Sequence, residues 1–231
     1  MRTRPDERGA KAPATGAEGH PAGRPATDRA SALARQQQSG FAATPLPDPA
    51  AAPAIALIES SSIAVGYVIA DALAKKAPVR ILRAQTASPG KFFVLYRGEV
   101  AEVQEAHAAG LEAAGDALVD ELLLPFAHPS LLPAMEGANS GGGLESLGIV
   151  ETFSFAAAIA AADTAVKTAP VRLLEIRPPI GMGGKSFFTL SGPLEDLQVA
   201  MEAALERIRP GGMICRHALI PNPHDDLSPF V

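Results

Sequence analysis

The 231-residue chain lacks features that several classes of protein require. Its single cysteine, Cys215, excludes an intrachain disulfide framework and is typical of a reducing compartment such as the cytoplasm. No uninterrupted apolar run reaches the roughly 20 residues of a membrane-spanning helix. The Arg-rich N-terminus has no apolar segment, so we expect no secretory signal. These absences favour a cytoplasmic protein with no membrane partner.

Basic residues are not in excess either. The chain has 20 Lys and Arg against 25 Asp and Glu, which gives a formal net charge of -5. Because nucleic-acid binding draws on a basic excess that displaces counterions, this balance argues against nucleic acid as the main partner. Hydrophobic residues make up 47% of the chain, which is ample for a buried core.

Motifs for catalysis or cofactor binding are incomplete. The five histidines include no pair at helical or zinc-finger spacing, so we expect no metal site. Residues 180–186 resemble a phosphate loop, but Pro179 stands where that motif needs glycine. Ser186 stands where the dinucleotide motif needs its third glycine. No nucleophile–base pair is visible, and we expect neither an enzyme nor a cofactor.

The chain contains an internal repeat. Residues 56–83 align with 148–175 at a constant shift of 92 positions, and the shift grows to 94 and then 96 toward the end. The aligned pairs share residue type: Glu59 and Glu151, Asp71 and Asp163, Lys75 and Lys167, and His128 and His224. The repeat predicts two related domains in tandem, at 54–137 and 138–231, with residues 138–145 as a linker.

The first 53 residues differ in composition from the rest. They are rich in Ala, Pro, Gly and Arg and have almost no large apolar side chains. Such a segment cannot bury enough surface to offset its ordering entropy, so we predict a disordered N-terminal extension at 1–53. Residues 27–35 within it could form a helix on a partner.

Each repeat predicts the element order β-α-β-β-α-β. In the first, strands are expected at 54–59, 79–83, 91–96 and 117–124, with helices at 63–76 and 99–115. In the second, strands are expected at 147–151, 171–175, 185–190 and 213–219, with helices at 155–168 and 193–208. This order is that of a split βαβ unit, and the predicted fold class is α/β, an α+β sandwich of one sheet with helices on it.

Three polar residues are interpreted as structural. Glu59 and Glu151 occupy equivalent strand ends, which favours a structural role over an acid–base pair. Cys215 falls within a predicted strand beside apolar residues, which is typical of a buried, inert thiol.

The pattern resembles the bacterial microcompartment shell proteins in their tandem-domain, trimeric form. Each repeat has a matching opening strand (ALIES and GIVET), an Asp-x-x-x-Lys helix, an Ala-Pro-Val stretch and a strand that ends in glycine. Residues 220–224 (IPNPH) are similar to the family's Ile-Pro-Arg-Pro-His ending. The resemblance covers about 54–230, with the elements in the ordinary and not the circularly permuted order.

The resemblance implies a structural role. In that family, three chains form a flat pseudohexameric tile with a central pore for metabolites between cytoplasm and lumen, and tiles join edge to edge. Expected partners are therefore two further copies of this chain, other shell proteins that form hexameric and pentameric tiles, and encapsulated enzymes. Some tandem members hold an iron–sulfur cluster through loop cysteines, and neither equivalent loop has cysteine here.

The resemblance also assigns positions. The expected pore-lining residues are Ala87, Ser88, Pro89, Gly90, Ile180, Gly181, Met182, Gly183 and Gly184. Small residues would let six loops approach one axis, and their exposed backbone N–H groups would favour anionic metabolites. The loops differ in length by two residues, which predicts a threefold opening. The expected tile-edge residues are Lys75, Lys167, Asn222, His128 and His224, with Asn222 in place of the family's Arg.

One alternative stays open at this point. Paired split βαβ domains also serve as small-ligand-binding regulatory modules, which would bind a metabolite and assemble no shell.

Overall fold

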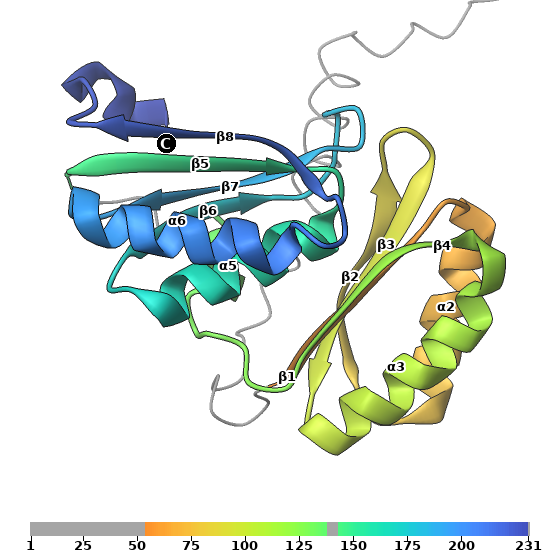
Figure 1. Ribbon diagram of the computed structural model, residues 1–231. Coiled ribbons are helices and arrows are strands. Elements are labelled where there is room, and N and C mark those ends of the chain that lie inside the picture. The colour runs from red at the N-terminus through yellow and green to blue at the C-terminus, as the bar shows by residue number, and fades with distance from the viewer. Residues whose placement is uncertain (1–53, 138–142, 231) are drawn as a thin grey trace, which may run out of the picture. The chain divides into compact units, whose positions relative to one another are not determined.

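The computed structural model describes residues 54–137 and 143–230 (Figure 1). The predicted extension at 1–53 lies outside these residues, as do positions 138–142 of the predicted linker. Among the described residues, no helix is both long enough and apolar enough to cross a bilayer.

The first half folds as one antiparallel sheet with two helices. Its elements are β1 (Ala54–Ser60), α2 (Ile63–Lys76), β2 (Arg80–Ala87), β3 (Lys91–Gly98), α3 (Val100–Ala114) and β4 (Leu118–Leu124). The strand order is β2-β3-β1-β4, and each neighbouring pair is antiparallel. A short helix, α4 (Leu131–Met135), follows β4 and was not predicted from the sequence.

The second half repeats this plan. Its elements are β5 (Ser146–Thr152), α5 (Phe155–Thr168), β6 (Arg172–Arg177), β7 (Ser186–Ser191), α6 (Leu194–Ile208) and β8 (Ile214–Pro221), followed by a 3-10 turn, η3 (Asp225–Phe230). The strand order is β6-β7-β5-β8. The predicted fold class and element order are therefore confirmed for both halves.

Local sequence explains the ends of the helices that open each half. The hydroxyl of Ser62 accepts a hydrogen bond from Val65 N at 3.4 Å, and that of Ser154 accepts one from Ala157 N at 3.0 Å. Both helices stop before an Ala-Pro pair, where the residue preceding proline leaves the helical region. Helices α2 and α5 therefore have the predicted bounds.

The first sheet is buried on both faces. Alternate residues of β1 and β3, including Ala56 and Tyr96, pack with α2 and α3. The residues between them, including Leu57 and Phe93, belong to the larger core that also contains α5. Because side chains alternate across a strand, this division shows that a helix of the second half covers the other face of the first sheet.

Candidate functional site

The two expected pore loops meet within the chain. Ser88 N donates to Pro179 O at 2.9 Å, and Gly181 N donates to the Ser88 hydroxyl at 3.1 Å. A Cβ on Gly184 would lie 3.2 Å from Ser88 O, and this glycine has a φ of 89°. Glycine is therefore required where the second loop crosses the first. The sequence aligned the two loops, and the structure brings them side by side.

The loop residues differ in exposure. Ile180 is half exposed, and Pro89 and Gly90 are exposed. Ala87 is 6% exposed and forms the end of β2, because that strand runs further than predicted. Gly184 is buried, as Ala87 is, and the remaining expected pore residues are half-buried or exposed: Ser88, Gly181, Met182 and Gly183.

Glu59 holds the junction between the halves. Its side chain is 1% exposed, and its Oε1 accepts a hydrogen bond from Ala156 N, in the first turn of α5, at 2.8 Å. Its Oε2 has no hydrogen-bond partner among the described residues. Burial raises the pKa of Glu59 to about 7, while that backbone hydrogen bond and nearby Lys91 oppose the rise and Asp120 adds to it.

A second acceptor from the first half lies at the same helix end. Asp120 on β4 accepts a hydrogen bond from the hydroxyl of Ser154, the residue that caps α5. Phe93 of the first half packs edge-to-face on Phe155, with ring centroids 5.1 Å apart. Acidic groups stabilise a helix N-terminus, so the first half supplies both charge and apolar cover to α5.

The repeat partner of Glu59 has a different environment. Glu151 is partly exposed, and its Oε2 accepts from Lys185 Nζ at 3.0 Å and lies 3.8 Å from Cys215 Sγ. Hydrogen bonds to Glu151 and then to Cys215 raise the pKa of Lys185. The interpretation of Cys215 as a buried thiol was wrong, because β8 is an edge strand and the thiol is only half-buried.

One expected tile-edge group is occupied inside the chain. Asp163 and Lys167 on α5 form an ion pair of 2.5 Å, and Asp163 Oδ1 also accepts from His128 N at 2.8 Å. Lys167 Nζ donates to Phe126 O at 2.5 Å. The α5 pair thus holds the turn at 126–128 of the first half.

The equivalent group on α2 makes no such contact with residues 54–137 and 143–230. Asp71 and Lys75 on α2 form an ion pair of 2.7 Å, with side chains 61% and 74% exposed. The equivalent turn contains Asn222, whose φ is 49°, and His224, whose side chain is 78% exposed. The Asp–Lys pair and the turn therefore each occur twice. The α5 pair contacts the turn of the first half, whereas the α2 pair and the turn of the second half are exposed to solvent.

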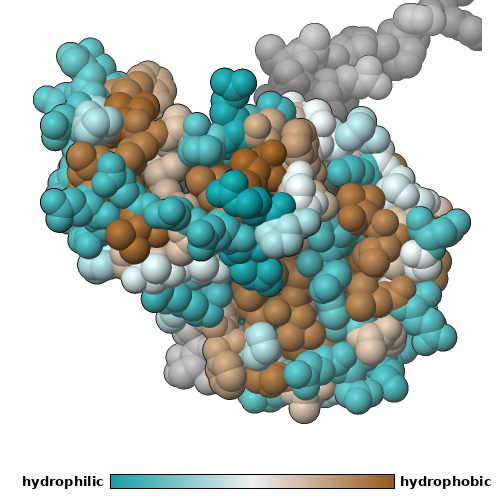
Figure 2. Space-filling model, in the orientation of Figure 1, coloured by the Kyte–Doolittle hydropathy of each residue, from teal (hydrophilic) through white to brown (hydrophobic). Residues whose placement is uncertain are grey.

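Burial of the two aligned helices differs in the same way. Helix α5 buries ten of its fourteen residues, whereas α2 of equal length buries three. The exposed apolar residues of α2 are Ile63, Tyr67 and Val68. Their equivalents Phe155, Ile159 and Ala160 are each at most 6% exposed. Figure 2 shows apolar patches among hydrophilic side chains on one side of the molecule.

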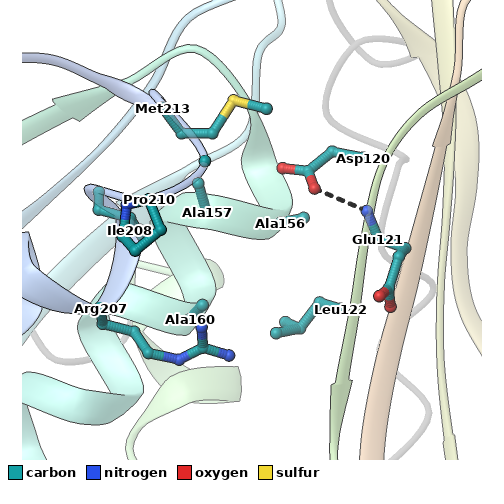
Figure 3. Close-up of a pocket in the computed structure, with 11 residues that line it drawn as sticks. Asp120, Glu121, Leu122, Ala156, Ala157, Ala160, Arg207, Ile208, Pro210 and Met213 are labelled. Atoms are coloured by element: carbon teal, nitrogen blue, oxygen red, sulfur yellow. Dashed lines mark hydrogen bonds between the residues drawn. The ribbon is translucent and has the colours of Figure 1, made fainter.

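A cavity of about 190 Å³ lies beside the junction (Figure 3). Asp120 and Glu121 line it from β4, and Arg207 approaches from the end of α6 (Figure 3). Its acidic groups already have protein partners, since Asp120 binds Ser154 and Glu121 binds His107 at 2.8 Å. The cavity therefore offers no nucleophile with a base, and the described residues contain no cluster that could hold a metal ion.

Sequence reasoning missed a buried polar chain in the first half. The Tyr96 hydroxyl lies 2.5 Å from His107 Nδ1, and His107 Nε2 lies 2.8 Å from Glu121 Oε2. Burial raises the pKa of Tyr96, so its hydroxyl keeps the proton and donates to His107. The aligned residues of the second half are Leu190 and Met201, so the repeat gave no signal for this chain.

These observations define a class of protein: two copies of one α/β sandwich, joined through a shared helix and two adjacent loops, without a catalytic set in the described residues. The BMC domain family matches the chain twice, over residues 54–127 and 146–223. The chain therefore belongs to the BMC-domain family of bacterial microcompartment shell proteins.

Known proteins of similar sequence or structure agree. The chain is 42% identical over 174 residues to the bacterial microcompartment shell protein PduT of Citrobacter freundii, covering 75% of this chain and 95% of PduT. A microcompartment protein of Desulfitobacterium hafniense DCB shares 43% identity at a TM-score of 0.69, covering 76% and 98%. The carboxysome assembly protein CcmO of Synechococcus elongatus is 26% identical over 191 residues, covering 78% and 68%. The chain is a structural shell protein and not an enzyme.

Proposed function

We propose that three copies of this chain close into a pseudohexameric tile with a central pore. The proposal depends on one observation: the contacts that join the halves inside the chain use residues whose repeat equivalents are exposed. One set of these residues is engaged within the chain and the equivalent set is exposed, so each chain carries two complementary surfaces. Head-to-tail association through such surfaces closes into a ring when the rotation between successive copies completes a full turn. Two halves per chain and six positions in the ring require three copies.

The polar contacts between copies follow from those within the chain. Glu59 accepts from Ala156 N, so Glu151 of one copy would accept from Ala64 N of its neighbour. Lys167 donates to Phe126 O, so Lys75 of the neighbour would donate to Asn222 O. By the same rule, Asp71 would accept from the backbone N–H of His224, as Asp163 does from His128.

The apolar contacts follow in the same manner. Helix α2 exposes Ile63 and Tyr67 to solvent, whereas the equivalent residues of α5 are buried. The second sheet has a less buried face that includes Ile149 and Phe187, whereas their equivalents Leu57 and Phe93 are fully buried by α5. Placing α2 of one copy on the second sheet of the next would remove both apolar surfaces from water.

The paired loops would surround the pore. With three copies, residues 87–90 and 180–184 would alternate around one axis, and the two lengths would give a threefold opening. Lys91 begins β3 and Lys185 immediately precedes β7, so both lysines lie behind these loops and would favour anionic metabolites at the opening. The described residues 54–137 and 143–230 would then form the first and second domains on either side of the linker.

Tile edges would use the residues that hold the turns. Lys167 keeps 43% of its side chain exposed while it binds Phe126 O, and Lys75 is more exposed still. These lysines, together with His128, Asn222 and His224, would contact neighbouring shell tiles. Many weak contacts of this kind sum to a stable sheet. Encapsulated enzymes would lie on one side of that sheet.

Light scattering coupled to size exclusion tests the tile. We expect a particle of three times the 23.8 kDa chain mass at micromolar concentration. Asp71→Ala should shift this particle toward the monomer, whereas Glu105→Ala, an exposed acidic residue on α3, should leave its mass unchanged. A monomeric wild-type chain under these conditions would exclude the tile.

A further inference from the structure

Each half ends in a short segment at an equivalent position of the repeat, and the first of these segments is buried whereas the second is exposed. After the turn at 126–128, the first half continues into α4, whose Leu131 and Ala134 are buried and which packs against β6. After the turn at 222–224, the second half continues into η3, whose Leu227 and Phe230 are 38% and 82% exposed. The shift of 96 positions aligns Leu131 with Leu227 and Ala134 with Phe230.

The strands that would receive these segments also differ. On β6, Leu173 and Ile176 are 1% exposed and share one core with the residues of α4. On β2, the equivalent Ile81 is half-buried and Ala84 is exposed. Both β2 and β6 are edge strands of their sheets, so topology alone does not explain the difference. Among the described residues, Ile81 and Ala84 lack the cover that α4 gives to β6, although Arg83 between them donates to Met135 O of α4 at 3.5 Å.

We propose that η3 of each chain covers β2 of the neighbouring copy, as α4 covers β6 within the chain. This C-terminal clasp, formed by Leu227 and Phe230, rests on the proposed trimer and extends its interface to a second site. The occupant of the exposed β2 surface is thus a second copy of this chain.

Side-chain size and charge fit this assignment. Within the chain, α4 has the small residue Ala134 and β6 has the large residue Ile176. At the equivalent positions, η3 has the large residue Phe230 and β2 has the small residue Ala84. Such an exchange conserves packed volume. Asp225 and Asp226 on η3 are acidic, whereas Arg80 at the exposed start of β2 is basic, so the charges on the two segments are opposite.

A fluorescent reporter gives a direct test, because the chain contains no tryptophan. In Phe230→Trp, we expect the introduced indole to emit at short wavelength and to resist acrylamide quenching in the trimer. The matched control is Val199→Trp, at an exposed apolar position on α6, whose indole should be quenched as readily as a free tryptophan derivative. Light scattering on the same samples establishes whether the trimer is present.

The outcomes separate the clasp from the trimer. A trimer whose indole at position 230 is fully quenched would overturn the clasp and leave the tile intact, whereas a monomeric wild-type chain would overturn both. A second measurement uses the double variant Leu227→Asp with Phe230→Asp. Because burying one such side chain contributes roughly tenfold or more to an association constant, trimers should dissociate at a concentration raised by at least about that factor. Val199→Asp should leave that concentration unchanged, and an unchanged value in the double variant would also overturn the clasp.

Discussion

Replacing Glu59 with glutamine should favour the folded protein increasingly as the pH rises. The carboxyl is buried at the junction, its Oε1 binds Ala156 N and its Oε2 has no partner among the described residues. A glutamine amide keeps the acceptor oxygen for that backbone group and cannot ionise. The variant therefore removes the cost of a buried negative charge, which depends on pH, while its amide N–H groups add a desolvation cost that does not depend on pH.

The sign follows from the pKa of Glu59, which is raised from 4.5 to about 7 by burial. Between these values the folded chain holds a proton that the unfolded chain releases, so wild-type stability falls as the pH rises through this window. The ionisation cost is ~1 kcal/mol at pH 5 and ~3 kcal/mol at pH 8, from the linkage relation for one group. The advantage of Glu59→Gln should therefore grow by about 2 kcal/mol between these pH values.

Urea unfolding followed by circular dichroism measures this difference. Wild type and variant are compared at pH 5, 6, 7 and 8 and at one protein concentration, because association changes the apparent stability of an oligomer. Glu105→Gln, which changes an exposed carboxylate on α3, is the control and should show no growing advantage. If the free-energy difference for Glu59→Gln is the same at pH 5 and pH 8, the carboxylate is not held in the environment described here.

Three further changes test the packing and the junctions. Gly66→Ala should lower the free energy of unfolding by about 1–3 kcal/mol, because its Cβ would lie 2.3 Å from a phenyl ring on β3; an unchanged urea midpoint would contradict this. Asp163→Asn should destabilise the fold of each chain, whereas Asp71→Asn should weaken only association; equal urea midpoints for the two variants would argue against distinct roles. Lys75→Ala combined with Lys167→Ala should weaken the trimer, because Lys75 would lose its contact with Asn222 O, and should impair sheets even at concentrations where trimers form; intact sheets seen by electron microscopy would remove these lysines from the tile edge.

Sequence patterns located the elements that have local signals. Helices α2 and α5 were predicted to the residue because a serine caps each start and a proline ends each run. Strand β2 extends to Ala87, beyond its predicted end, because pairing with β3 continues to Lys91. Helix α4 had no prediction, since five residues held against β6 depend on tertiary contacts and not on local propensity.

Site residues were predictable in kind but not in environment. Glu59 and Glu151 lie near the ends of equivalent strands, yet Glu59 is buried with a raised pKa and Glu151 pairs with Lys185. The difference arises from what covers each strand end, and that cover comes from the other half of the molecule. The Tyr96–His107 contact was missed for a related reason, because it occurs in one half only.

The register of the sheets gives this two-domain chain two junctions of different charge, which a single-domain protein cannot have. Opposite Glu59 on the neighbouring edge strand stands Asp120, and opposite Glu151 stands Arg216. In a ring of three chains, acidic and basic seams would therefore alternate, three of each. A ring of six identical subunits must repeat one seam six times. Acidification near neutrality would protonate Glu59 and so act on the acidic seams, which lie within each polypeptide.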